Sequence, residues 1–183
     1  MIFCTNFMFQ LTLILGTARV GRQSEKVANY ILKKIAGRSD LEVTFVDVKD
    51  HIHGRTIPPW ENSELTRPWR DLVKASDGFW IVTPEYNYNF PSELKMLLDQ
   101  ELGNYAGKPV AFASVSSGGF GGVRAIEHLV PLARRIGLIP LLADLNFSKV
   151  AELFEKSEAE LDASYAVKIT TIIDKLLNFG AKK

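Results

Sequence analysis

The segment Gly16-Thr-Ala-Arg-Val-Gly-Arg-Gln-Ser24 contains residue types that bind phosphate groups. It offers two hydroxyl groups and two guanidinium groups, from Thr17, Ser24, Arg19 and Arg22. An apolar run precedes the segment and apolar residues at helical spacing follow it, so it should join a buried strand to the start of a helix. The first N–H groups of a helix are unpaired and the helix dipole is positive there, which favours an anion. The pattern indicates a phosphate site, and an ordinary strand-to-helix turn without a ligand is the alternative.

Two other segments are suited to contact with a flat ligand. Thr83-Pro-Glu-Tyr-Asn87 is turn-prone and offers backbone groups and an aromatic ring. Ser116-Ser-Gly-Gly-Phe-Gly-Gly122 has four glycines in its last five residues, and glycine lets a backbone approach a ligand closely. Its glycines do not have the G-x-G-x-x-G spacing of a dinucleotide-binding motif, so a flexible turn is the alternative interpretation.

Strands and helices that alternate along the chain must position these segments. Apolar and β-branched runs predict five strands, at Leu11–Leu15, Leu41–Val48, Gly78–Thr83, Val110–Val115 and Leu138–Leu145. Helical spacing predicts a first helix with Ser24 as its N-cap, and further helices at Trp69–Ala75, from Pro91 at N1 through Leu102, at Val123–Ile136 and at Glu158–Leu177. The stretch Lys49–Pro68 has no periodicity and should be a long excursion outside the core.

The alternation predicts an α/β fold with a flavodoxin-like, doubly wound, five-stranded parallel sheet of order 2-1-3-4-5 and helices on both faces. In that order, ligands bind outside the carboxyl ends of the strands, at the switch point between strands one and three. The loops Gly16–Ser24 and Thr83–Asn89 would meet there, with the glycine-rich loop beside them. Pro140 in the fifth strand favours an edge position for that strand.

Length and composition restrict the other classes of protein. A chain of 183 residues fits one domain over 1–183, in which residues 1–10 form a short lead-in without the basic start of a signal peptide. Twenty-two basic and 21 acidic side chains leave a net charge of +1, which gives no indication of a nucleic-acid partner. No apolar run approaches the roughly 18 residues of a membrane span, so we expect no membrane partner and a cytoplasmic location. The single Cys4 excludes an internal disulfide framework.

A nucleoside-triphosphate site is one alternative for the first segment. Gly16 and Gly21 have the glycine spacing of a P-loop, and Val43–Asp47 could supply an acidic strand end for magnesium. Arg22 and Gln23, however, stand where that motif needs the lysine that contacts the phosphates and the hydroxyl that holds magnesium. This class is therefore disfavoured.

Metal and side-chain chemistry also find little support in the sequence. His51 and His53 lack the companion ligands that a metal needs, so we expect solvated loop histidines. No Ser/His/Asp arrangement or Cys/His metal pattern is present. The chemistry should therefore belong to a cofactor, and no catalytic side chain or metal ligand is predicted.

The three segments resemble the corresponding motifs of the NAD(P)H-dependent FMN reductase family, which includes quinone and chromate reductases. The resemblance covers about Leu11 to Leu145, and the Pro-Glu-Tyr-Asn segment followed by Pro and Leu-Lys is its most specific part. It implies that the FMN phosphate is held by Thr17, Arg19 and Ser24. It also implies that the isoalloxazine ring is bordered by Pro84, Glu85, Tyr86 and Asn87, and that the far side of the flavin site is closed by Ser116, Ser117 and Gly118.

The resemblance further implies an oxidoreductase with FMN as cofactor and NAD(P)H as reductant. Hydride would pass through FMN to a quinone, a free flavin or a similar small acceptor by a ping-pong mechanism, in a homodimer or homotetramer. The stretch Lys49–Pro68 departs from the family in lacking its acidic Leu-Pro segment, which bears on substrate preference and oligomer contacts. Two alternatives are an FMN-binding electron carrier without reductase activity and a non-catalytic interaction domain. The aromatic residues Trp60, Trp69 and Phe90 could anchor an oligomer interface or pack locally.

Overall fold

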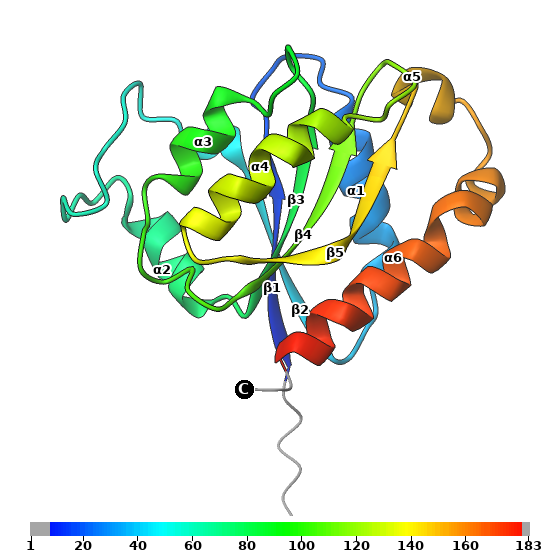
Figure 1. The fold of residues 1–183 in the computed structure, drawn as a ribbon. Coiled ribbons are helices and arrows are strands. Elements are labelled where there is room, and N and C mark those ends of the chain that lie inside the picture. Colours follow the sequence, from blue (N-terminus) through cyan, green and yellow to red (C-terminus); the bar gives the residue numbers. More distant parts are fainter. Residues whose placement is uncertain (1–7, 181–183) are drawn as a thin grey trace, which may run out of the picture.

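The computed structural model of the protein describes residues 8–180 and contains one five-stranded sheet. All neighbouring strands are parallel and their order is β2-β1-β3-β4-β5, as Figure 1 shows. The strands are β1 (Phe9–Leu15), β2 (Leu41–Asp47), β3 (Gly78–Pro84), β4 (Pro109–Val115) and β5 (Ile139–Phe147). The predicted fold class, a flavodoxin-like doubly wound sheet, is therefore confirmed.

Helices cover both faces of the sheet because side chains of each strand alternate between the two faces. Leu13 and Trp80 lie in the core beneath α1 (Ser24–Ile35) and α6 (Glu158–Gly180). Ile14 and Ile81 lie in the opposite core, which is covered by α2 (Arg67–Ala75), α3 (Ser92–Leu98) and α4 (Val123–Arg135). All residues of β3 and β4 are buried, which explains why their sequences are almost continuously apolar.

The boundaries of several elements differ from those predicted. Pro91 is the N-cap of α3 instead of its first residue, and α3 ends before Leu102, which is 51% exposed. The sequence also gave no sign of the 3-10 helix η1 (Val48–His51) or of the short helix α5 (Val150–Leu153). Pro140 does lie in the edge strand β5, close to a shift in its register with β4.

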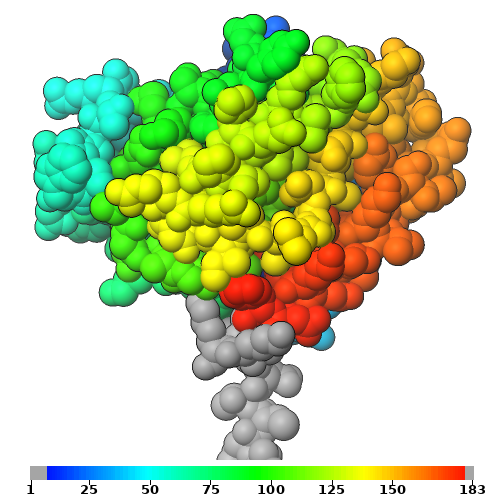
Figure 2. Space-filling view, in the orientation of Figure 1, coloured from blue at the N-terminus to red at the C-terminus, as the bar shows by residue number. Residues whose placement is uncertain are grey.

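The excursion after β2 runs from η1 to α2 and projects as the cyan lobe at one side of the molecule (Figure 2). His51 is not simply solvated: its ring lies 5.9 Å from that of Trp69, and burial lowers the pKa of His51. Trp69 itself is fully buried, and its indole N–H donates to the hydroxyl of Tyr105, so of its two suggested roles it has the local packing one. Trp60 is 81% exposed. Within residues 8–180, no helix has the length and apolar character needed to cross a membrane.

Candidate functional site

A cavity of about 270 Å³ lies where the loops after β1, β3 and β4 meet. These loops stand at the carboxyl ends of their strands, at the top of Figure 1. The lining consists of Arg19, Gly21, Arg22, Gln23, Ser24, Pro84, Glu85, Tyr86, Val115, Ser116, Ser117 and Val150. Seven of the ten residues proposed for cofactor binding line this cavity; Thr17, Asn87 and Gly118 do not.

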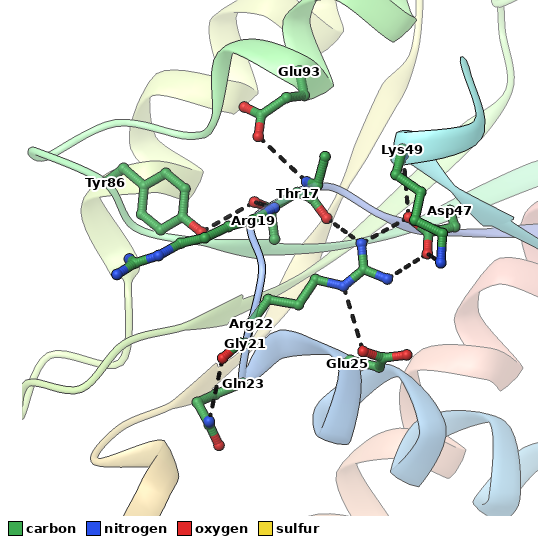
Figure 3. Close-up of polar contacts among 11 residues, drawn as sticks. Thr17, Arg19, Gly21, Arg22, Gln23, Glu25, Asp47, Lys49, Tyr86 and Glu93 are labelled. Carbon is green, nitrogen blue, oxygen red and sulfur yellow. Dashed lines mark hydrogen bonds and ion pairs between the residues drawn. The ribbon is translucent and has the colours of Figure 1, made fainter. Parts of the chain in front are cut away.

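Arg22 ties the first loop to the end of β2 (Figure 3). Its Nη1 donates to the carbonyl oxygen of Thr17 at 2.5 Å and to Oδ1 of Asp47 at 2.8 Å, and its Nη2 donates to Oδ2 of Asp47. Hydrogen bonding to Asp47 raises the pKa of Arg22. Burial raises the pKa of Asp47, but hydrogen bonds from Arg22 and Lys49 outweigh this and hold it below its ordinary value. Asp47 is thus the partner of a buried guanidinium, not an acidic strand end left available for magnesium.

Arg19 points away from Arg22, along the ring of Tyr86 (Figure 3). Its guanidinium carbon lies 5.5 Å from the centre of that ring, and its side chain is exposed at the cavity. The backbone N–H of Arg19 donates to Oγ1 of Thr17 at 3.3 Å. No ion pair involving Arg19 is found among the described residues, so its charge remains available to an anion in the cavity.

Ser24 is the first residue of α1, and the N-cap is Gln23, so the predicted capping role of Ser24 is wrong. Gln23 has helical dihedral angles and makes no capping hydrogen bond with its side chain. Ser24 is 1% exposed, yet its Oγ has no hydrogen-bond partner within the described part of the chain. A buried hydroxyl without a partner is costly, so this oxygen at a helix N-terminus fits a ligand that brings a hydrogen-bonding group.

The loop after β3 makes a tight two-residue turn. The N–H groups of Tyr86 and Asn89 donate to each other's carbonyl oxygens at 2.8 and 2.9 Å. Asn87 and Tyr88 between them have φ values of 50° and 68°, the left-handed conformations of a type I′ turn. Asn87 is exposed on this turn and does not reach the cavity lining. The turn instead directs Tyr86 inward, where its hydroxyl lies 3.0 Å from Oγ1 of buried Thr17.

Glu85, which also lines the cavity, has a second unpartnered oxygen. Its Oε1 accepts a hydrogen bond from Arg124 at 3.3 Å, while its Oε2 is buried and has no partner in the described residues. The backbone N–H of Glu85 donates to the carbonyl oxygen of Val115, which fixes this residue to β4. The carboxylate therefore has an acceptor oxygen available for an N–H or O–H group of a ligand.

The third loop is held by the chain that follows β5. The N–H of Ser116 donates to the carbonyl of Phe147 at 3.0 Å, and the N–H of Val150 donates to the carbonyl of Ser116 at 3.1 Å. The carbonyl of Gly118 accepts from the N–H of Lys149 and from Oγ of Ser116, so Gly118 shapes the loop without lining the cavity. These bonds bring in Val150, a lining residue that no sequence motif indicated.

Four further lining residues were also missed as site residues. Gly21, Arg22 and Gln23 lie within the first segment, where the guanidinium of Arg22 was already considered for a phosphate, and Val115 directly precedes the third segment; none of the four was assigned to the cofactor. No group of three or more His, Cys, Asp or Glu residues that could hold a metal ion occurs in residues 8–180.

A parallel sheet with a phosphate-type loop after β1 and a cavity between three loops defines a protein of the flavodoxin-like class. A family model described as NADPH-dependent FMN reductase matches residues 9–152. The chain belongs to this family, and it is therefore an oxidoreductase with FMN as cofactor and NAD(P)H as reductant, as the sequence motifs indicated. The interpretations as a nucleoside-triphosphate enzyme or a non-catalytic interaction domain are set aside.

Individual relatives agree with this assignment. A quinone reductase of Pseudomonas putida is 32% identical over 129 residues, which cover 67% of this chain and 68% of that protein. The structure of the NAD(P)H:acceptor oxidoreductase FerB from Paracoccus denitrificans has a TM-score of 0.75 at 20% identity and covers 96% of this chain and 98% of its own. The FMN-dependent NADH-azoreductase from Bacillus anthracis in complex with FMN has a TM-score of 0.65 at 14% identity, with coverages of 93% and 100%. The two structural likenesses concern the fold.

Proposed function

We propose that this protein transfers hydride from NAD(P)H through FMN to a quinone or a similar small acceptor by a ping-pong mechanism. The observation that carries the proposal is the convergence of three loops on one cavity lined by Ser24 and Glu85, each of which has a buried side-chain oxygen without a partner in the described residues. Quinones are suggested as acceptors because the Pseudomonas putida relative is named a quinone reductase.

In this proposal, the first loop binds the phosphate of FMN. Ser24 would donate from its unpartnered hydroxyl, Arg19 would supply the charge, and the first N–H groups of α1, which a helix leaves without partners in the preceding turn, would complete the site. Thr17 would support these residues without contacting the phosphate itself, because its buried hydroxyl already contacts Tyr86 and the N–H of Arg19. It therefore holds the first two loops together.

The second and third loops would hold the flavin ring. The turn at Tyr86–Asn89 fixes its own backbone, so Pro84, Glu85 and Tyr86 would present a rigid edge to the ring. Ser116 and Ser117 would close the opposite side. Bound FMN would supply the redox chemistry between the nicotinamide and the acceptor. The side chains would contribute binding and orientation, with no general acid or base among them.

Initial-rate and rapid-mixing kinetics test the proposal. If nicotinamide and acceptor use the same open face in turn, double-reciprocal plots at several acceptor concentrations give parallel lines. NADH and NADPH are mixed with the protein in separate stopped-flow experiments, which should show reduction of the bound flavin. A quinone added afterwards should reoxidise it. Tyr86→Ala should lower turnover with the quinone more than FMN affinity, because the backbone of this loop would bind the flavin. Flavin that binds tightly but is reduced by neither nicotinamide would favour the electron carrier instead.

We also propose that the protein forms a homodimer or homotetramer. Trp60 and Leu102, 81% and 51% exposed, line a mainly apolar hollow between the excursion and the end of α3. Exposed aromatic residues of this kind often anchor interfaces. Light scattering of the FMN-loaded protein at micromolar concentration tests this, and a monomer of 20.5 kDa would contradict it. The cytoplasmic location stays a prediction.

A further inference from the structure

Arg22 occupies the position at which a P-loop would place its phosphate-binding lysine, but its guanidinium points toward β2 (Figure 3). Its side chain is 5% exposed and that of its partner Asp47 is 7% exposed. The two Nη atoms donate to the two carboxylate oxygens, one Nη also donates to the Thr17 carbonyl, and Nε lies 3.5 Å from Glu25. The guanidinium of Arg22, at the end of the loop, is thus bonded both to Thr17 at the beginning of the loop and to Asp47 at the end of β2.

Asp47 is itself held in place from its other side. Its Oδ1 accepts from the backbone N–H of Lys49 at 3.1 Å, and its Oδ2 lies 3.0 Å from Nζ of the same residue. To reach a phosphate in the cavity, the guanidinium of Arg22 would have to leave a carboxylate that is almost entirely buried. The carboxylate would then keep only its contacts with Lys49, and a buried charge that loses most of its partners is unfavourable, so the pair should persist when a ligand binds.

We infer that Arg22 and Asp47 form a positioning pair that sets the shape of the FMN phosphate loop without touching the cofactor. The pair fixes the Thr17 carbonyl at the beginning of the loop and Arg22 at its end. Ser24 and Arg19, the residues proposed to contact the phosphate, are then held between a fixed strand end and a fixed helix start. This inference rests on the proposed FMN site.

The substitution Asp47→Asn separates a positioning pair from a direct ligand. If Arg22 contacted the phosphate, weakening its bond to position 47 would leave FMN affinity unchanged or raise it. A positioning role predicts a loss of at least about tenfold, because small displacements of binding groups have large effects. Riboflavin has no phosphate for this loop to bind, so displacing the loop should change its affinity by less than about threefold.

Arg22→Lys gives a second, independent comparison. Lysine keeps the charge but lacks the planar fork that bonds both carboxylate oxygens, so a positioning role predicts a loss of FMN affinity close to that of Arg22→Gln. A direct phosphate ligand would instead lose clearly less affinity with lysine than with glutamine, because lysine still binds phosphate as a point charge. Because both residues act through one pair, the double variant Arg22→Gln/Asp47→Asn should bind FMN about as well as either single variant.

The matched control is Asp40→Asn, which breaks another Arg–Asp pair, with Arg38, that contributes nothing to the cavity lining. FMN and riboflavin affinities are measured by titration of the flavin-free proteins, together with hydrogen exchange of the amides of residues 17–24. Faster exchange of residues 17–24 in Asp47→Asn that exceeds any change in the buried strands β3 and β4, and that is absent from Asp40→Asn, supports the inference. Unchanged exchange, or unchanged FMN affinity in Asp47→Asn, overturns it. If the natural protein bound no FMN, the proposed function would fail, whereas the exchange comparison would still test the pair.

Discussion

Replacing Ser24 with alanine should change stability and cofactor affinity in opposite directions. The hydroxyl of Ser24 is buried without a partner, so it weakens the flavin-free fold and is available to the ligand. Alanine removes the unpaired hydroxyl and is also the better helix former at the first position of α1. The flavin-free variant should therefore be more stable, and its FMN complex weaker.

The magnitude follows from the position of the side chain. A buried polar group without a partner costs about 1–3 kcal/mol, and a hydrogen bond to a charged group contributes about 1.5–3 kcal/mol. We expect the free energy of unfolding of the flavin-free protein to rise by about 1 kcal/mol, which raises Tm by about 2–4 °C for a chain of this size. FMN affinity should fall by about tenfold, equivalent to about 1.4 kcal/mol, with riboflavin little affected.

Thermal unfolding of the flavin-free protein and fluorescence titrations with FMN and riboflavin measure the two effects. The matched control is Ser92→Ala, because Ser92 is also the first residue of a helix but is exposed and hydrogen-bonded to Glu93. A flavin-free Ser24→Ala protein that is less stable than the natural protein, with unchanged FMN affinity, would refute the reasoning. The hydroxyl would then have a structural role.

Three further changes have defined outcomes. Arg19→Ala should weaken FMN binding by about 1.5–3 kcal/mol while riboflavin binding stays nearly constant, since a charge-assisted bond to phosphate is lost; equal losses for both flavins would remove the phosphate contact. Gly122→Ala should destabilise the fold by at least about 1 kcal/mol, because Gly122 has a φ of 85° and a Cβ there would lie 3.0 Å from the Cβ of Ser114; denaturant unfolding measures this, and no loss would contradict it. Because its folded-state pKa is lowered, the Asp47 carboxylate stabilises the fold above the unfolded value of about 3.9 and this contribution fades as pH falls through the folded value. Asp47→Asn should therefore be about 3 kcal/mol less stable at pH 7, the scale of a broken buried pair, with a gap that narrows below about pH 4 in chemical unfolding; a constant gap would exclude the ion pair as its cause.

The strands and their order could be predicted because burial dictates their composition. β3 and β4 are covered on both faces, so they consist of apolar residues bounded by turn signals. The four-residue elements η1 and α5 could not be predicted, because four residues are too few to show a helical period. The predicted N-cap, Ser24, is one residue later than the observed N-cap, Gln23. Gln23 adopts helical dihedral angles, which residue type alone does not reveal.

Arg19 and Arg22 differ in a way that the sequence motif does not predict: Arg22 is paired with Asp47, whereas Arg19 is not paired with a carboxylate in the described residues. Both are arginines in one polar loop and either could bind a phosphate, but only their surroundings decide which one is available. The parallel register pairs Leu15 with Asp47, so the end of β2 lies beside the start of the loop. The predicted strand order already placed these two strands together, and testing acidic strand ends against nearby arginines would have found the pair.

The contrast between paired and unpaired groups in the first loop also explains how a ligand would bind with little rearrangement. Arg22 and Asp47 satisfy each other within the protein, so their charges are neutralised before any cofactor arrives. Ser24 Oγ lies in the same loop and is not satisfied. A loop that is already ordered before binding loses little conformational entropy when the ligand binds. The hydroxyl of Ser24 remains free to form a hydrogen bond with that ligand. The affinity for a phosphate should therefore depend on both kinds of residue, through shape in one case and through direct contact in the other.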